Sequence, residues 1–295
     1  MRRFAASVAA VLIGWLALSG AAAAAPAMWR VSGPHSQIYL FGTLHALSPK
    51  AQWRTPLYDQ VLAQADTIWF EADMGTGDPA TIRAIVQQYG ADPQHPLSAK
   101  LSPTDLAALS READVARIDH LRPWAVALML SMRPVLARGA SVQAGADATA
   151  TRVARGDGKT VRGFETLEDQ ARMYASLPEA SEVQYLTDVI HERNSPPRLD
   201  IQPRLPFRPA TLEAEWLAGD LARLGPELVG RMKAGNPGLY DALLKRRNLA
   251  WADKLAPELN GSGVELVNVG ALHMVGDEGL PALLAARGYK VERVQ

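Results

Sequence analysis

The sequence has no cysteine among its 295 residues. This absence excludes disulfide bonds, a lipid anchor attached through cysteine, and catalysis by a thiol. The chain must therefore be held together by its apolar core, and 48% of its residues are hydrophobic. Its length is sufficient for one large domain or two small ones.

An excess of charge of either sign is also absent. The chain carries 31 basic and 31 acidic residues, so its net charge is zero. Proteins that bind nucleic acids or anionic membrane surfaces usually show a basic excess or a basic patch. We therefore expect no nucleic-acid partner, while a peptide or a small molecule stays open as substrate. The oligomeric state cannot be deduced from these values.

Long apolar runs are confined to the N-terminus. Met1-Arg2-Arg3 gives a positive start, residues 4–18 are almost uninterruptedly apolar, and small residues follow up to Ala24. This layout is typical of a secretory signal peptide. The alternative is a membrane anchor, but the run is short and no positive stop-transfer cluster follows it. We predict that residues 1–24 are a signal peptide and that the protein is exported to the periplasm without stable membrane insertion. The export route, Sec or Tat, stays open.

Strand-like segments cluster near both ends of the chain, and helical segments fill the centre. Runs rich in Ile, Val, Trp and Phe predict strands at Met28–Ser32, Gln37–Phe41, Asp66–Glu71, the end of Gly156–Glu165, Val264–Val269 and Tyr289–Val294. Helical spacing predicts helices at Pro56–Gln64, Pro79–Tyr89, Leu106–Arg117, Pro123–Arg138, Ala144–Arg155, Thr166–Ala175, Pro178–Arg193, Leu212–Leu221, Leu239–Leu255 and Asp277–Arg287. Ser195–Pro209 lies between the predicted helices Pro178–Arg193 and Leu212–Leu221. It holds five prolines and is predicted to be a loop.

This order of elements predicts an α/β fold. Its mixed sheet is formed by both ends of the chain, and a helical insertion or cap covers about residues 97–237. We expect one domain over residues 25–295.

A short motif occurs twice, each time directly after an apolar strand. The first copy is Gly42-Thr43-Leu44-His45 and the second is Gly270-Ala271-Leu272-His273. Glu71 and Glu165 also end predicted strands. In an open α/β sheet, ligands bind beyond the carboxyl ends of the strands, so these four titratable side chains are predicted to converge at one edge. Glycine at the strand end lets the backbone turn sharply and lets a ligand approach closely.

Two interpretations of this constellation remain open from spacing alone. Imidazole and carboxylate together suit a divalent metal such as manganese, cobalt or zinc, which activates a water molecule for hydrolysis. A histidine beside apolar residues is, however, more often a hydrogen-bonded core residue. The chain also lacks the local His-x-x-x-His helix of the strongest metalloprotease signature.

The sequence resembles the TraB/GumN family, part of a wider group that includes Tiki proteins, ChaN haem-binding lipoproteins and erythromycin-esterase-like proteins. The resemblance covers nearly the whole chain after residue 24 and rests on matching segments in the same order. These are MWRVSGPHSQIYLFGTLHALSP, ADTIWFEADM, RPWAVALML, GADATATRVARGDGKTVRGFETLEDQ, RRNLAWADKL and VELVNVGALHMVGDEGLPALLAARGYKVERV.

The resemblance implies a single site built from the paired Gly-x-x-His motifs and acidic residues, and some Tiki members are described as metal-dependent proteases. At the matching positions it implies site roles for His45, Glu71 and His273. Glu165 and Arg247-Asn248 match further family motifs. One departure is visible, because many relatives have an apolar residue between the Gly and Asp of a Gly-x-Asp motif where this chain has Gly145-Ala146-Asp147. This departure gives Asp147 less weight as a site residue.

We therefore predict an exported metal-dependent hydrolase of peptide or amide bonds. His45, Glu71 and His273 would hold manganese, cobalt or zinc, Glu71 being a ligand or the general base. Glu165 and Arg247 would support the reaction, Arg247 as a cation beside a carboxylate or an oxyanion. The alternative is a protein without turnover that sequesters a peptide, haem or another small ligand.

Overall fold

A computed structural model describes residues 25–72, 79–194 and 209–295 of the chain. The predicted signal peptide, residues 1–24, and nearly all of the predicted proline-rich loop therefore lie outside the described residues. No helix in the described ranges is long and apolar enough to cross a bilayer.

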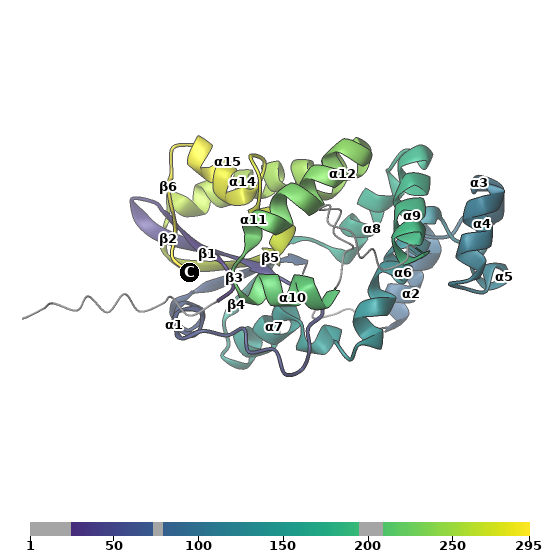
Figure 1. Cartoon of the computed structure of the whole chain (residues 1–295). Helices are drawn as coiled ribbons and strands as arrows, with labels where there is room; N and C mark the ends of the chain where they lie inside the picture. Colours follow the sequence, from purple (N-terminus) through teal and green to yellow (C-terminus); the bar gives the residue numbers. More distant parts are fainter. Residues whose placement is uncertain (1–24, 73–78, 195–208) are drawn as a thin grey trace, which may run out of the picture.

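The fold is a mixed α/β sheet built by both ends of the chain, as the sequence predicted (Figure 1). Its six strands are ordered β4-β3-β5-β2-β1-β6. They span β1 Met28–Ser32, β2 His35–Thr43, β3 Thr67–Ala72, β4 Thr160–Glu165, β5 Ser262–Gly270 and β6 Lys290–Arg293. The four strands from β4 to β2 run parallel, whereas β1 pairs antiparallel with both β2 and β6.

Short and medium helices make up most of the rest of the described chain. The first group is α1 Pro56–Gln64, α2 Pro79–Tyr89, α3 Leu97–Lys100, α4 Pro103–Ser110, α5 Val115–Ile118, α6 Pro123–Ala137, α7 Ala146–Gly156, α8 Leu167–Ala175 and α9 Glu179–Asn194. The second group is α10 Pro209–Leu217, α11 Leu221–Leu224, α12 Gly230–Gly235, α13 Pro237–Tyr240, α14 Arg246–Leu259 and α15 Leu280–Ala286. Shorter helical turns are η2 Val142–Ala144, η3 Gly225–Val229, η4 Asp241–Lys245 and η5 Ala271–Met274.

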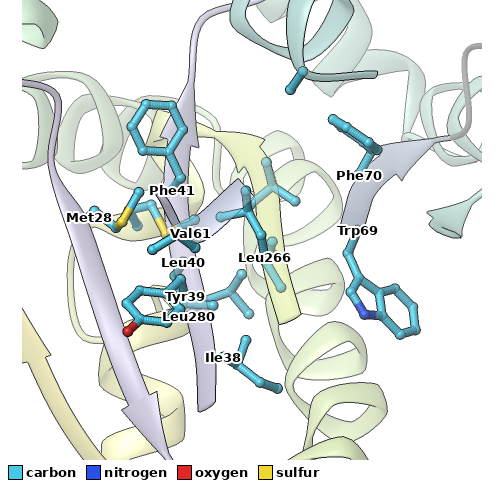
Figure 2. Close-up of a cluster of buried hydrophobic side chains, with 14 of the residues drawn as sticks. Met28, Ile38, Tyr39, Leu40, Phe41, Val61, Trp69, Phe70, Leu266 and Leu280 are labelled. Atoms are coloured by element: carbon cyan, nitrogen blue, oxygen red, sulfur yellow. The ribbon is translucent and has the colours of Figure 1, made fainter. Parts of the chain in front are cut away.

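The inner parallel strands β3, β5 and β2 are largely apolar, and helices cover both faces of the sheet. Figure 1 places α14 and α15 on one side of it and α1 and α7 on the other. The side chains of Ile38, Leu40 and Leu266 are completely buried in the resulting core, which Figure 2 shows in close-up. The register sets Leu40 beside Val267 and Gly42 beside Val269, so β2 and β5 end at the same edge.

The central helices form a smaller core of their own beside the sheet. Leu97, Leu109, Leu130 and Leu186 are completely buried in it, and they come from α3, α4, α6 and α9. This cluster corresponds to the predicted helical insertion. The range predicted for the insertion also contains β4, which pairs with β3 and brings Glu165 to the main sheet.

Several predicted helices differ from the observed ones at their breaks and ends. The segment predicted as one helix over Leu106–Arg117 contains two helices, α4 and α5, with Asp114 at the start of α5. The helix predicted over Leu239–Leu255 runs through α13, the π-helical turn η4 and α14 to Leu259. Apolar spacing does not distinguish a π-helical turn from α-helix, and such turns are frequent at functional sites.

Candidate functional site

The first Gly-x-x-His loop follows β2 and packs directly against the second. A Cβ on Gly42 would lie 3.0 Å from the Ala271 Cα and 3.1 Å from the Met274 side chain, which is tighter than ordinary contact. The Gly42 carbonyl accepts a hydrogen bond from the buried Trp216 indole at 2.7 Å. Glycine at this strand end therefore allows η5 to approach the loop that carries His45.

The second motif places its glycine inside the site. The Gly270 backbone N–H donates to Glu71 Oε1 at 2.7 Å. A Cβ on Gly270 would stand 2.9 Å from that oxygen and 3.6 Å from His45 Nε2. The absence of a side chain thus lets Glu71, His45 and His273 surround the end of β5.

Glu71 lies on β3, the neighbour of β5, and is held by a buried cation. Arg247 Nη2 donates to Glu71 Oε2 at 2.7 Å, and both side chains are largely buried. Burial by itself would raise the pKa of Glu71, but the positive charge of Arg247 outweighs it and lowers the pKa well below its ordinary value. Glu71 is therefore an ionised carboxylate across the physiological pH range.

Arg247 joins the two acidic residues that the sequence placed at strand ends. Its side chain is 7% exposed. Its Nε atom lies 3.0 Å from each carboxylate oxygen of Glu165, and Nη2 lies 2.9 Å from Glu165 Oε2. The guanidinium also lies over the Trp251 ring at 4.5 Å, and the Trp251 indole N–H donates to Glu165 at 3.1 Å. The π-helical turn η4 precedes Arg247, whose Nη1 donates to the Leu243 carbonyl at 3.0 Å.

His273 is buried in one defined tautomer. Its Nδ1 lies 2.5 Å from Asn248 Oδ1, and Asn248 Nδ2 donates to the Glu278 carbonyl at 2.7 Å. Because that amide oxygen only accepts, Nδ1 carries the proton. His273 Nε2 then accepts from Arg247 Nη1 at 3.2 Å. Burial, together with the charge of Arg247 and against the pull of Glu71, lowers the pKa of His273 to about 3, so the ring is neutral.

His45 has the opposite environment. Its side chain is 59% exposed, and its Nδ1 lies 2.8 Å from Asp147 Oδ2. Thr43 donates to the other oxygen of Asp147 at 2.6 Å. The negative charge of Asp147 raises the pKa of His45 above its ordinary value, and solvent around the exposed ring weakens this effect. Asp147 orients the His45 ring so that Nε2 points toward Glu71.

The site residues chosen from the sequence come together in the structure. Glu71 Oε1 lies 4.0 Å from His45 Nε2 and 3.6 Å from His273 Nε2. Glu165 and Arg247 lie directly behind this group. Asp147 of the Gly-x-Asp motif, which has less weight from the sequence alone, also lies beside this group and contacts His45 Nδ1. The buried Trp251 forms a wall of the site, with its ring 4.4 Å from that of His273.

The ring nitrogens of His45 and His273 and the carboxylate oxygens of Glu71 are of the kinds that a divalent metal ion prefers as ligands. An ion about 2.1 Å from tetrahedral ligands holds them roughly 3.4 Å apart. The observed separations of 3.6 and 4.0 Å from Glu71 Oε1 exceed this value only by several tenths of an ångström. In the described part of the chain, no group of three His, Asp or Glu side chains is spaced to hold an ion as it stands. In the described arrangement, His273 Nε2 is engaged by Arg247 Nη1 at 3.2 Å.

A large cavity lies in front of the cluster. Its volume is about 880 Å³, and His45, Glu71, Arg247 and His273 are among its lining residues. Leucines from several helices line much of the remainder. The cluster is therefore accessible to a molecule of substantial size while its innermost members stay buried.

Comparison with known proteins finds similarity along most of the chain. The sequence model of the TraB/PrgY/gumN family matches residues 27–293, which include all six strands. The chain is 28% identical over 273 residues to the uncharacterized protein YbaP of Escherichia coli (strain K12), covering 92% of this chain and 96% of that protein. The protein of the same name from Shigella flexneri matches with the same identity and coverage. No solved structure matches the chain.

Proposed function

The chain belongs to the TraB/PrgY/gumN family, and from that premise we propose that it is an exported hydrolase of amide bonds that works with a divalent metal ion at His45, Glu71 and His273. One observation carries the proposal. Two ring nitrogens lie 4.0 and 3.6 Å from the same carboxylate oxygen, at a strand end where glycine leaves room for a ligand.

Each histidine is held in the way that metal-binding histidines usually are. A ligand histidine generally gives its second ring nitrogen to a carboxylate or carbonyl oxygen, which fixes the tautomer and strengthens the ligand. His45 Nδ1 faces Asp147, and His273 Nδ1 faces the Asn248 amide oxygen. Both Nε2 atoms consequently face the side of Glu71. When bound there, manganese, cobalt or zinc would polarise the amide carbonyl and lower the pKa of a water molecule.

The surroundings of Glu71 support a role as metal ligand rather than as general base. A general base works best when its pKa is close to the operating pH. Burial opposes ionisation of Glu71, but Arg247 prevails and holds the pKa of the carboxyl far below that range. A carboxylate that is always ionised and is anchored by Gly270 N–H is better suited to hold a cation in place. Arg247 and Glu165 act as supports that fix its position.

A binding protein without turnover is the second candidate, and a specific contact favours it. Arg247 donates both to Glu71 Oε2 and to His273 Nε2. The guanidinium thereby already provides a positive charge and hydrogen bonds where a metal would provide them. A polar cluster satisfied in this way can recognise a ligand in the cavity without any ion.

Thermal unfolding with and without added manganese, cobalt or zinc tests the metal site. A ligand that binds only the folded protein stabilises it by about 2.7 kcal/mol at a hundredfold excess over Kd. We expect a higher Tm for the wild type and no gain for His273→Ala. His95→Ala is the matched control, because His95 is exposed and pairs only locally with Asp92. An equal gain in the wild type and His273→Ala would place the ion elsewhere.

Turnover of amide substrates against metal concentration then separates ligand from base. We expect Glu71→Gln to be slow at low metal concentration and to recover as the metal is raised, because a weakened ligand is compensated by mass action. A variant that lost a general base would stay slow at saturating metal, by about a hundredfold or more. Absence of turnover with every metal, combined with tight ligand binding by the metal-free protein, would favour the second candidate.

A further inference from the structure

The lining of the cavity is charged at the cluster of His45, Glu71, Arg247 and His273 and mostly apolar elsewhere. Around the charged cluster the lining is dominated by leucine side chains from α6, α10, α11, η3 and η4. They are Leu128, Leu212, Leu224, Leu228, Leu243 and Leu244. Leu224 and Leu244 are almost completely buried and belong to the apolar packing of the protein, so this part of the lining is continuous with the core.

We propose that this part of the cavity holds a long acyl chain, so that the substrate is an acylated amide whose scissile bond lies at the polar cluster. This inference rests on the proposed hydrolase function and names its substrate class. An aliphatic chain gains free energy from each methylene group transferred from water to an apolar surface. Its carbonyl end carries the polar atoms, which matches a cavity with one polar region and leucine walls.

A polypeptide fits the same lining less well. Every residue of a peptide brings an N–H and a C=O group, and burying such groups without partners costs free energy. Two polar side chains on the cavity wall already have partners within the protein. Arg152 Nη2 donates to the Gln143 carbonyl at 2.9 Å, and Gln170 Nε2 lies 3.4 Å from Glu71 Oε2. An acyl chain makes no such demand on the leucine walls.

The dimensions agree with a single small amphiphile. The volume of about 880 Å³ lies within the range of roughly 300–1,000 Å³ that is typical of small-molecule sites. Val142 lines the cavity and is exposed, as is the His45 ring, so a ligand can reach the site from solvent.

Calorimetric titration with saturated N-methyl amides of increasing chain length tests the proposal. The titration is done in a chelator, so that binding is measured without any metal and without hydrolysis. We expect Kd to fall about fourfold for each added methylene group, the equivalent of about 0.8 kcal/mol, and then to level off when the cavity is full. Binding that does not depend on chain length would overturn the proposal, as would preferential binding of leucine-rich peptide amides.

Two cavity variants and one matched control locate the binding site. Leu128→Glu places a charge on the cavity wall, and we expect it to weaken binding of the longest N-methyl amide of the series by at least tenfold. Leu249→Glu makes the same change at an exposed leucine of α14 that does not line the cavity, and it should leave Kd unchanged. Leu228→Trp fills part of the cavity, and it should move the levelling-off point to a shorter chain.

The outcomes distinguish this inference from the proposed hydrolysis. If chain-length-dependent binding occurs but no metal supports turnover, the acyl site stands and the hydrolase proposal fails. If metal-dependent turnover occurs but short and long amides bind equally, the hydrolase proposal stands and the acyl site fails. Equal Kd values for Leu128→Glu and Leu249→Glu would also overturn the acyl site, provided that circular dichroism shows both to be folded.

Discussion

Replacing Arg247 by methionine removes the charge on which the buried cluster depends. Arg247 is the donor to Glu71, Glu165 and the Leu243 carbonyl, and its side chain is 7% exposed. Methionine keeps much of the aliphatic volume but leaves two carboxylates without their partner. Arg246→Met is the matched control on the same helix, because Arg246 is 62% exposed and pairs with the exposed Asp241.

The two substitutions should differ clearly in free energy of unfolding. Removing one partner of a buried ion pair typically costs about 3–5 kcal/mol, because it leaves an uncompensated charge. An exposed ion pair contributes about 0–1 kcal/mol. In a domain of this size each kcal/mol shifts Tm by roughly 2–4 °C. We therefore expect Arg247→Met to lower Tm by about 6–20 °C at neutral pH, and Arg246→Met by at most about 4 °C.

The dependence on pH identifies the cause of the loss. In the wild type, burial opposes ionisation of Glu71, but Arg247 lowers its pKa below the ordinary value of 4.5. A lowered carboxylate pKa stabilises the fold above the ordinary pKa, and this stability is lost as pH falls. The difference between wild type and Arg247→Met should hence be largest above about pH 5 and shrink on acidification.

Calorimetric or circular-dichroism melts over a pH series measure both quantities. If Arg247→Met is no less stable than Arg246→Met at neutral pH, the ion cluster does not hold the site together. If the loss is large but constant with pH, it comes from packing against Trp251, which the guanidinium covers at 4.5 Å, and the electrostatic reasoning is refuted.

Three further predictions concern other parts of the protein. Asp147→Asn should weaken metal binding about tenfold to a hundredfold, because it removes the carboxylate that orients His45; unchanged affinity in a metal titration would exclude His45 as a ligand. Glu278→Gln should cost about 1 kcal/mol at pH 7, because hydrogen bonds from Lys245 and Tyr240 lower the pKa of Glu278 to about 2. Chemical denaturation should show this loss above about pH 4.5 and not near pH 2, with exposed Asp277→Asn as control; a loss that persists at pH 2 contradicts the assignment. The intact mass of the protein recovered from a periplasmic extract should correspond to cleavage near Ala24, whereas a mature chain beginning at its first methionine would contradict export by a cleaved signal.

The sheet and the meeting of the two motifs could be predicted because their signals are local. Apolar runs mark β2, β3 and β5, and a polar site residue lies at or shortly after the end of each, at the same edge of the sheet. Parallel pairing of these strands is then sufficient to bring His45, Glu71 and His273 together.

The protonation of the two histidines could not be predicted, because it depends on tertiary surroundings. His45 and His273 occur in the same four-residue motif, yet Asp147 raises the pKa of the first and burial lowers that of the second. Asp147 reaches His45 through a contact that the sequence does not reveal. A Cβ on Gly145 would lie 2.2 Å from the His45 carbonyl oxygen, so this glycine lets the start of α7 rest on the His45 loop.

The position of β5 between β2 and β3 determines when the site can form. These two early strands do not pair with each other, and each needs residues 262–270 as its neighbour. Until those residues are present, the chain can form only the β1–β2 and β3–β4 pairs. No described strand then connects these two pairs into one sheet. Contacts between residues more than 190 positions apart, such as Tyr58 with Asn268, form late because closing so long a loop is entropically costly. The site therefore cannot form before residues 262–270 are present, and a chain cut short before β5 carries no site at all.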